Sequence, residues 1–437
     1  MMTPTTTAKV YLWGELVGAV AWLEDRGYAA FEFNPAFLRS GWDISPLHLG
    51  IGTAAGRIFT FPALNKATYM GLPGLLADVL PDKFGNAIID TWLARQGRDA
   101  RSFSPVERLC YAGKRGMGAL EFVPAINRGL NKAVPVEIAE LVNLAQEVMR
   151  SRQKLDVAFG DDETMNAEAM LDILRIGTSA GGARPKAIIA MNAEGRVISG
   201  QGDVPGDYDH WILKFDGVTD LELGEPKEFG RVEYAYHLMA RAAGVQMTEC
   251  RLLEENGRAH FITKRFDRHG GHKIHMQSLC GIAHYDFNMA GAYGYEQAFQ
   301  VMRRLKLPKS DAIQLFRRMV LNVLARNQDD HTKNIAFLMD RSGAWRLSPA
   351  YDVTYAHNPA GKWTNVHQMT INGKRDAVTL EDFVTIGESI RMPRPVDVVS
   401  EIVEAVARWP EFAKQAGMND DLSAEIGRNH RQLRFVK

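Results

Sequence analysis

Cysteine is scarce in this sequence. Only three of the 437 residues are cysteines, Cys110, Cys250 and Cys280, and no CxxC pair occurs. Such few and widely spaced cysteines exclude a disulfide framework and give no zinc pattern, and they favour a reducing compartment. No apolar run approaches the roughly 18 residues that a membrane span needs, and the first residues lack the apolar core of a signal peptide. We therefore expect a cytoplasmic protein with no membrane partner.

An excess of charge of one sign is also missing. The sequence has 52 Lys and Arg against 52 Asp and Glu, so its net charge does not indicate a nucleic-acid binder. Low-complexity segments and internal repeats are absent, and 46% hydrophobic and 24% charged residues are typical of a globular chain. A single core rarely exceeds roughly 250 to 300 residues. A chain of 437 residues is therefore long enough for two or three packed units.

The order of the patterns predicts an α+β chain in three regions. Residues 1–128 begin with short strands and continue with helices, residues 129–275 alternate strands with a helix, and residues 276–437 are mainly helical. A glycine-rich loop, two strands, a helix and a hairpin, in that order, are typical of the N-lobe of a kinase. Apart from short strands within 8–61 and a linker at 127–135, we expect helices at 74–98 (two, meeting at a corner), 105–112, 135–152, 165–175, 228–243, 295–305, 309–326, 381–389, 395–409 and 422–434, and strands at 119–123, 187–191, 210–215, 250–253, 260–263, 334–339 and 344–347.

Polar residues with a particular spacing follow the apolar helix at 309–326. Asp329 is followed five residues later by Asn334, and Asp352 comes after the next hairpin. Phosphoryl transfer needs a carboxylate that orients the attacking hydroxyl and oxygen ligands for a metal ion that bridges the phosphates. Taken alone, such a cluster is more typical of a helix cap or a turn. Its place between a helix and a second carboxylate favours a site for ATP and Mg²⁺, with Lys333 near the γ-phosphate.

Lys214 interrupts an apolar strand, HWILKF. A lysine there must either reach water or find a counter-charge. If the chain is a kinase, Lys214 contacts the α- and β-phosphates and pairs with a glutamate on the next helix. Glu233 is the expected partner and Glu228 is the alternative. Further along, residues 263–268 are the expected hinge between the lobes. The nucleotide-binding residues expected there are Lys264, Arg265, Phe266 and Asp267, and the backbone of Lys264 to Phe266 is expected to contact adenine.

The glycine-rich segment 177–186, GTSAGGARPK, matches neither common phosphate-binding template. Its GxxxxG spacing is that of a P-loop, but Ala183 stands where that motif needs lysine, and no GxGxxG is present. Successive amides around Gly181 and Gly182 can still form an anion-binding nest, with Lys186 nearby. An exposed flexible loop is the alternative interpretation.

Several segments together resemble the signature segments of HipA-type serine/threonine kinase toxins. The segment 71–86, GLPGLLADVLPDKFGN, resembles the amino-terminal subdomain of that family, and the resemblance extends from about residue 10 to about residue 410. The other segments that carry it are SAGGARPKA (179–187), HWILKF (210–215), KRFDR (264–268), DDHTKNIAF (329–337) and SPAYDV (348–353).

The resemblance implies a two-lobed protein-kinase-like fold of the HipA type, with a small β-rich N-terminal subdomain and a mainly helical C-lobe. It implies that Asp329 is the catalytic residue and that Asn334 and Asp352 are the Mg²⁺ ligands. It also implies autophosphorylation of Ser179, or as second choice Thr178, which ejects the loop and ends ATP binding. The ATP-binding residues that it implies are Ala180, Gly181, Gly182, Ala183, Arg184, Pro185, Lys186, Lys214, His331 and Lys333.

The same resemblance implies partners. Members of the family usually act as toxins, which a small helix-turn-helix antitoxin of the HipB type neutralises. This chain would therefore contact DNA only through the antitoxin. Their best-known protein substrate is an aminoacyl-tRNA synthetase, a translation component. This chain departs from some members at Arg184 and Pro185, and it has Asp330 where glycine is frequent. Two alternatives stay open: a small-molecule phosphotransferase, although Asn327 stands where that class has histidine, and a non-toxic regulator that keeps the fold.

Overall fold

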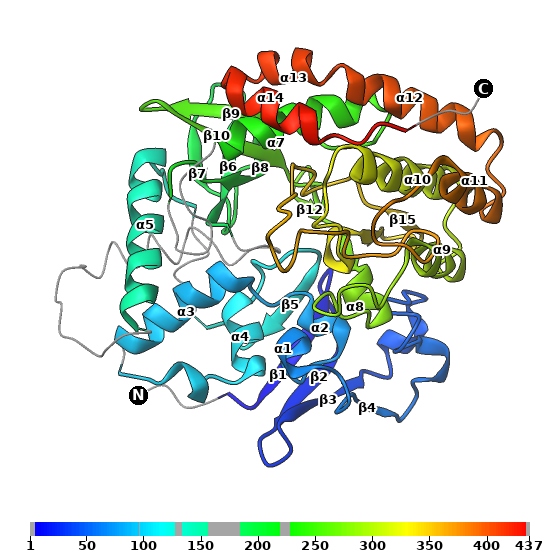
Figure 1. Cartoon of the computed structure of the whole chain (residues 1–437). Coiled ribbons are helices and arrows are strands. Elements are labelled where there is room, and N and C mark those ends of the chain that lie inside the picture. The colour runs from blue at the N-terminus through cyan, green and yellow to red at the C-terminus, as the bar shows by residue number, and fades with distance from the viewer. Residues whose placement is uncertain (1–4, 96, 127–132, 156–183, 219–227, 434–437) are drawn as a thin grey trace.

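The computed structural model describes residues 5–95, 97–126, 133–155, 184–218 and 228–433. The helix expected at 165–175 and the glycine-rich loop up to Ala183 lie outside these residues. Within them, the chain forms an N-terminal subdomain and two lobes, with the N-terminal subdomain below both lobes in Figure 1. The three parts pack against one another around the junction of the lobes.

The N-terminal subdomain is built on an antiparallel sheet with the strand order β4-β3-β2-β1-β5. Alternate residues of its first strand are buried, as expected for a sheet with one face against a core. The turn after that strand places Trp13 and Gly14 at φ 51° and 91°, the left-handed pair of a tight hairpin. The strands are β1 (Thr7–Leu12), β2 (Glu15–Leu23), β3 (Tyr28–Phe33), β4 (Ile58–Thr60) and β5 (Leu120–Val123).

Helices cover one face of this sheet. The sequence 74–98 does form helices that meet at a corner, because Pro81 interrupts it between α2 and α3. The helix α4 starts with Ser104 and Glu107 bonded to each other's backbone amides, which satisfies two amides at its start. The helices are α1 (Lys66–Tyr69), α2 (Gly74–Ala77), α3 (Lys83–Arg95) and α4 (Pro105–Ala112).

The N-lobe is a five-stranded antiparallel sheet, order β7-β6-β8-β10-β9, with a long helix α7 packed on β9 and β10. The turn of the β9–β10 hairpin uses Asn256 and Gly257 at positive φ, which an Asn-Gly pair adopts readily. Residues 133–135, expected as linker, extend the sheet: the amide of Ser199 donates to the Val134 carbonyl over 2.8 Å. The elements are α5 (Ile138–Leu155), β6 (Lys186–Asn192), β7 (Val197–Ser199), β8 (Tyr208–Lys214), α7 (Phe229–Ala242), β9 (Cys250–Glu255) and β10 (Arg258–Lys264).

The C-lobe is mainly helical, with a small three-stranded sheet, β13-β14-β15, at its base. The sequence indicates β14 and β15 but not β13 or α13. The helix α13 packs against α7, so the last helices return to the N-lobe, as the top of Figure 1 shows. The elements are β11 (Arg268–His269), β12 (His272–Lys273), β13 (His275–Ser278), α8 (Leu279–Ala283), α9 (Tyr295–Arg304), α10 (Lys309–Leu324), β14 (Ala336–Met339), β15 (Trp345–Leu347), α11 (Leu380–Ser389), α12 (Pro395–Ala407), α13 (Trp409–Gln415) and α14 (Asp420–Asn429).

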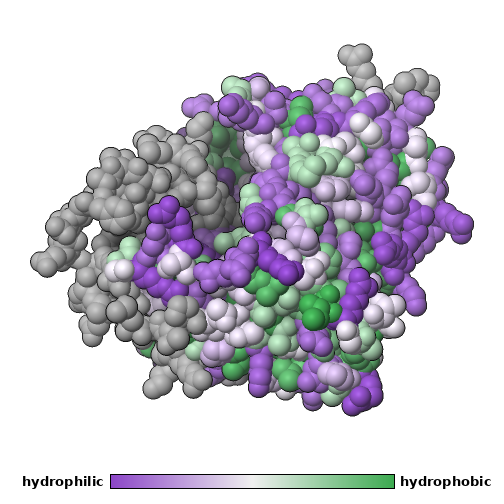
Figure 2. All heavy atoms as spheres, turned by 90° about the horizontal axis from the view of Figure 1, so that it is seen from below, coloured by the Kyte–Doolittle hydropathy of each residue, from purple (hydrophilic) through white to green (hydrophobic). Residues whose placement is uncertain are grey.

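The face seen in Figure 2, from below the N-terminal subdomain, intersperses apolar residues among polar ones. Ile58 on the edge strand β4 is 62% exposed. Single exposed apolar residues are normal on protein surfaces. No helix among the described residues combines the length and the apolar character needed to cross a membrane.

Candidate active site

A lysine with two carboxylate partners marks the junction of the lobes. Lys214, at the end of β8, donates to Oε1 of Glu233 on α7 over 2.5 Å, and it also donates to Oδ1 of Asp352. Burial acts against the charge of Lys214, but Asp352 and Glu233 outweigh it and raise the pKa of the ammonium group. The lysine is therefore charged at every physiological pH, and it links a strand, a helix and the C-lobe.

Glu233, and not Glu228, is the partner of this lysine. Glu233 is on the buried face of α7 and is 3% exposed. Glu228 precedes the first turn of the helix, where its carboxylate accepts from the amide of Asn419 over 2.9 Å. The spacing of residues along α7 explains the difference, because Glu228 lies before the helix and Glu233 is turned towards the sheet.

The loop after α10 carries the next predicted residues. Asp329 is half-buried, and the side-chain amide of Asn334 donates to its main-chain carbonyl over 2.8 Å. That bond uses the nitrogen of the Asn334 amide, so the amide oxygen is directed away from Asp329. Trp363 donates from its indole nitrogen to Oδ1 of Asp329 over 2.6 Å, and Nε2 of His331 is 3.8 Å from the same oxygen.

Burial raises the pKa of Asp329, and His331 and Trp363 oppose that rise, while the negative charges of Asp352 and Asp330 add to it. Asp352 differs: despite burial, Lys214 and Lys186 lower the pKa of its carboxyl. Asp352 also has φ 52°, a conformation that costs energy for a residue with a side chain and that often marks functional sites. Asp329 and Asp352 are close enough for their negative charges to interact, which gives this corner an affinity for cations.

The donor set fits a magnesium ion. Asp352 offers a carboxylate and Asn334 an amide oxygen, both on the wall of the pocket between the lobes. Mg²⁺ prefers such hard oxygen ligands, and in phosphoryl-transfer sites it takes only one or two from the protein and the rest from phosphates and water.

A pocket of about 1020 Å³, part of it open to solvent, lies between the lobes. Phe266 and Tyr351 stand side by side in its wall, with ring centres 5.6 Å apart. Flat rings in a mainly apolar wall that also carries several lysines suit a nucleotide, whose base is apolar on its faces and whose phosphates are anionic. The predicted residues that line the pocket are Lys186, Lys214, Glu233, Lys264, Arg265, Phe266, Lys333, Asn334 and Asp352.

The N-terminal subdomain also lines this pocket. Asp78 and Leu80, which follow α2, and Met117 reach its wall. The carboxylate of Asp78 accepts from the hydroxyl of Ser278 on β13 over 2.6 Å. These residues could not be predicted, because nothing in their local pattern places them beside lysines that lie far away in the sequence.

The hinge follows β10. The amides of Lys264 and Arg265 donate to the carbonyls of Glu249 and His210, each over 2.9 Å. Those bonds use two of the three hinge amides, and among the described residues the Phe266 amide has no partner. The side chain of Lys264 turns to Asp209, 2.6 Å away.

Asp267 is placed differently from the expectation. It is fully buried, away from the pocket wall, where Arg265 and Arg268 each contact its Oδ2 at 2.7 Å. The amide of Gly118 donates to the same oxygen over 2.7 Å. Although burial acts to raise it, the two guanidinium groups hold the pKa of Asp267 well below its usual range. Its side chain therefore joins the hinge to the N-terminal subdomain and is not available to a nucleotide.

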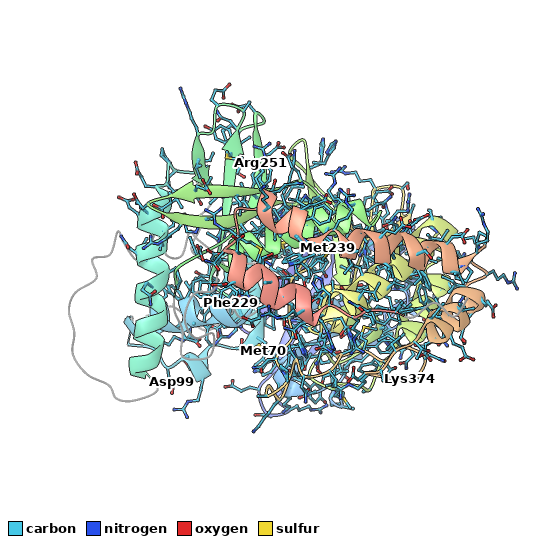
Figure 3. All side chains as sticks on the ribbon, turned by 45° about the horizontal axis from the view of Figure 1, so that its top comes forward. Met70, Asp99, Phe229, Met239, Arg251 and Lys374 are labelled. Atoms are coloured by element: carbon cyan, nitrogen blue, oxygen red, sulfur yellow. The ribbon has the colours of Figure 1, made fainter. Side chains whose placement is uncertain are left out.

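Three residues at the end of the glycine-rich loop are described. The guanidinium of Arg184 lies 4.0 Å from the ring centre of Phe229, which Figure 3 labels at the start of α7. Burial lowers the pKa of Arg184, with Glu233, Asp352 and Asp329 opposing. The Pro185 carbonyl accepts from Phe215 over 3.2 Å. Residues Thr178, Ser179, Ala180, Gly181, Gly182 and Ala183 lie outside the described residues.

His331 and Lys333 flank Asp329. The ring of His331 is 5.3 Å from that of Phe287, and Nζ of Lys333 is 4.9 Å from the centre of the same ring. Lys333 lines the pocket, whereas His331 stands beside Asp329 outside that wall. Asp330, the departure from the family pattern, is 3% exposed and accepts from Tyr295 and from the amide of Gln368, over 3.0 and 2.8 Å.

Two lobes joined by a hinge, with a lysine–glutamate pair above a loop that carries Asp329, define a protein-kinase-like fold. Residues 178–411 match the model of the HipA-like C-terminal domain, and residues 8–123 match that of the HipA N-terminal domain. The chain belongs to the HipA family. The family and the fold predicted from the sequence are therefore confirmed.

A solved structure of a family member agrees with this fold. HipA of Shewanella oneidensis MR-1, solved with HipB and its operator DNA, has a TM-score of 0.62 and 15% identity, covering 96% of this chain and 94% of that one. The Helicobacter pylori proinflammatory kinase CtkA covers 57% of this chain and 90% of that one, with a TM-score of 0.35 and 12% identity. No curated protein matches this chain.

Proposed function

We propose that this protein is an ATP- and Mg²⁺-dependent serine/threonine protein kinase of the HipA type. The observation that carries the proposal is the position of Lys214, bonded to both Glu233 and Asp352 in the pocket between the lobes. This arrangement fixes a cation beside a metal-binding carboxylate before any nucleotide arrives. Preorganised charges of this kind supply most of the catalysis in phosphoryl transfer.

The other residues have matching roles. Lys214 and Lys186 neutralise the phosphates, and the Phe266 region holds the base. Asn334 and Asp352 would hold Mg²⁺, which would supply positive charge to offset that of the phosphates. Asp329 orients the hydroxyl of a serine or threonine and receives its proton.

Labelled ATP tests the activity. Asp329→Ala and Asp352→Ala should each reduce transfer of the γ-phosphate by at least about a thousandfold, because each removes a charge that the transition state needs. Asp25→Ala, in the exposed turn between β2 and β3, is the matched control. Transfer at the wild-type rate in either active-site variant would refute the assignment.

We also propose that the protein is the toxin of a toxin–antitoxin pair. The support is the family, together with the Shewanella structure, which contains HipA, HipB and operator DNA. A HipB-type antitoxin should bind this chain and carry it to operator DNA, while the chain alone should not shift that DNA in a gel. Binding of the chain alone would contradict an indirect role.

The proposed target is a translation component such as an aminoacyl-tRNA synthetase. Comparing the phosphoproteins of cells that express the wild type with those of cells that express Asp329→Ala identifies it. Phosphorylation confined to proteins outside translation would overturn this part of the proposal while leaving the kinase activity intact.

Autophosphorylation of Ser179, with Thr178 as second choice, is the proposed off-switch. The loop leads into Arg184, whose charge interacts with those of Glu233 and Asp352, so a phosphate nearby would change the local charge. Mass spectrometry after incubation with Mg-ATP should find phosphate on Ser179, and Ser179→Ala should stay active for longer. Phosphate on other residues alone would exclude this switch.

A further inference from the structure

Trp363 lies outside every segment that suggested a kinase, yet it contacts the residue expected to do the chemistry. Its indole N–H donates to Oδ1 of Asp329 over 2.6 Å. The tryptophan belongs to the long segment between Asp352 and α11, which in kinases runs past the substrate site. A hydrogen bond to an ionised carboxylate is among the stronger ones in proteins.

The segment that carries Trp363 is fastened to the catalytic loop by a second residue. Asp330 accepts from the amide of Gln368 over 2.8 Å and lies 3.0 Å from Nδ1 of His367. Gln368 also donates from its side chain to the main-chain carbonyl of Trp363. Asp330 therefore positions Gln368, and Gln368 in turn positions the main chain of Trp363.

Main-chain bonds complete the attachment. The amide of Gln328 donates to the Ala356 carbonyl over 3.0 Å, and the Ala356 amide donates to the Arg326 carbonyl over 3.1 Å. The indole is thus positioned from both sides of its segment, at Ala356 and at Gln368. Many kinases need a phosphorylated residue to order this segment, whereas here buried bonds to the unmodified Asp330 order it.

We propose that Trp363 is a positioning residue for phosphoryl transfer, fixing one oxygen of Asp329 so that the other faces the acceptor hydroxyl. This inference rests on the proposed kinase function. In the step, the acceptor oxygen bonds to the γ-phosphorus, the bond from that phosphorus to the bridging oxygen breaks, and ADP leaves. The hydroxyl proton passes to Oδ2 of Asp329. Because Trp363 is not on the pocket wall, it acts on this step and not on nucleotide binding.

Kinetics of the full chain separate this role from a structural one. Trp363→Phe keeps the ring and loses the N–H, so kcat for γ-phosphate transfer from labelled ATP, summed over protein and water, should fall about tenfold to a hundredfold. The dissociation constant of ATP should stay within about twofold. Trp42→Phe is the matched control, since its indole donates to the Arg341 carbonyl over 2.8 Å, far from the site.

The contact itself can be seen without catalysis. The chain has 8 tryptophans, so 5-fluorotryptophan labelling gives a countable set of ¹⁹F signals, of which Trp363→Phe identifies one. Asp329→Asn should move that signal and leave the Trp42 signal in place. An unmoved Trp363 signal, or kcat in Trp363→Phe that is unchanged or raised, would overturn the inference. A wild type that transfers no phosphate would instead refute the kinase function on which the inference rests.

Discussion

Lys186 and Asp82 form a buried ion pair across two parts of the molecule, with Nζ and Oδ2 3.1 Å apart. Asp82 directly precedes α3 in the N-terminal subdomain, and Lys186 is the first residue of β6 and lines the pocket. Both side chains are less than 5% exposed. A subdomain remote from the lobes in sequence thus supplies the counter-charge of a lysine in the nucleotide pocket.

Asp82→Ala should lower the free energy of unfolding by about 3 to 5 kcal/mol, because it leaves the charge of Lys186 buried without this partner. Urea unfolding followed by circular dichroism measures the loss. Adding Lys186→Met to Asp82→Ala should restore part of it. If Asp82→Ala were as stable as the wild type, the ion pair would not contribute to the free energy of unfolding.

Glu233→Gln should lower kcat/KM for ATP by at least about tenfold, because Lys214 loses one of the two charges that hold it in place. Glu228→Gln, at the residue just before the same helix, is the matched control and should change the value by less than about twofold. Steady-state kinetics with labelled ATP measure both. Equal effects of the two substitutions would contradict the assignment of Glu233 as the partner.

Asp267→Asn should destabilise the protein by about 3 kcal/mol, since Arg265 and Arg268 lose the charge that neutralises them in a buried place. Its effect on the dissociation constant of ATP, compared at a temperature where the variant is folded, should be small. Thermal unfolding and nucleotide titration measure the two quantities. If the variant were as stable as the wild type but bound ATP weakly, Asp267 would have to be assigned to the nucleotide site after all.

Asp382 provides a prediction about pH. Its carboxylate accepts from the amide of Thr379 at the start of α11 over 2.8 Å, and from Lys374 over 2.8 Å. Although burial acts to raise the pKa, Lys374 and the other donors lower it to about 2. The folded pKa is below the unfolded value of about 3.9, so the stabilisation is complete above pH 4 and is lost as the pH falls through 2.

Asp382→Asn should therefore cost about 1 to 2 kcal/mol of unfolding free energy at pH 7, and less at pH 3. Urea unfolding at the two pH values measures the difference. Glu381→Gln, on the exposed side of the same turn, should cost less than about 0.5 kcal/mol at either pH. A cost for Asp382→Asn that grows as the pH falls would contradict the sign of the shift.

Much of the site could be predicted because its residues lie in short segments with fixed spacing. Asn334 contacts Asp329 within one loop, and Lys214 and Glu233 belong to a strand and the next helix. Local patterns of this kind can be recognised in a single sequence. Most helices were predicted for the same reason, since their apolar residues recur with the helical period.

The residues that were missed reach the site over long distances in sequence. Asp78 and Trp363 lie more than 100 residues from Lys214 in opposite directions, and neither stands in a pattern that indicates a contact. The strand β13 has four residues, too few for a period to be recognised. Asp267 was assigned to the nucleotide because it lies within the expected hinge, whereas its side chain is buried against Arg265, Arg268 and Gly118.

The bonds behind the hinge bear on how quickly the protein exchanges its nucleotide. Arg265 and Arg268 both donate to the carbonyl of Gly116, which fixes the pivot between the lobes to the N-terminal subdomain. Nucleotide release in kinases accompanies opening of the lobes. Hydrogen bonds that restrain the hinge should make this opening rare. We expect slow release as a consequence, so that a molecule that has bound ATP keeps it through a brief fall in the cellular supply.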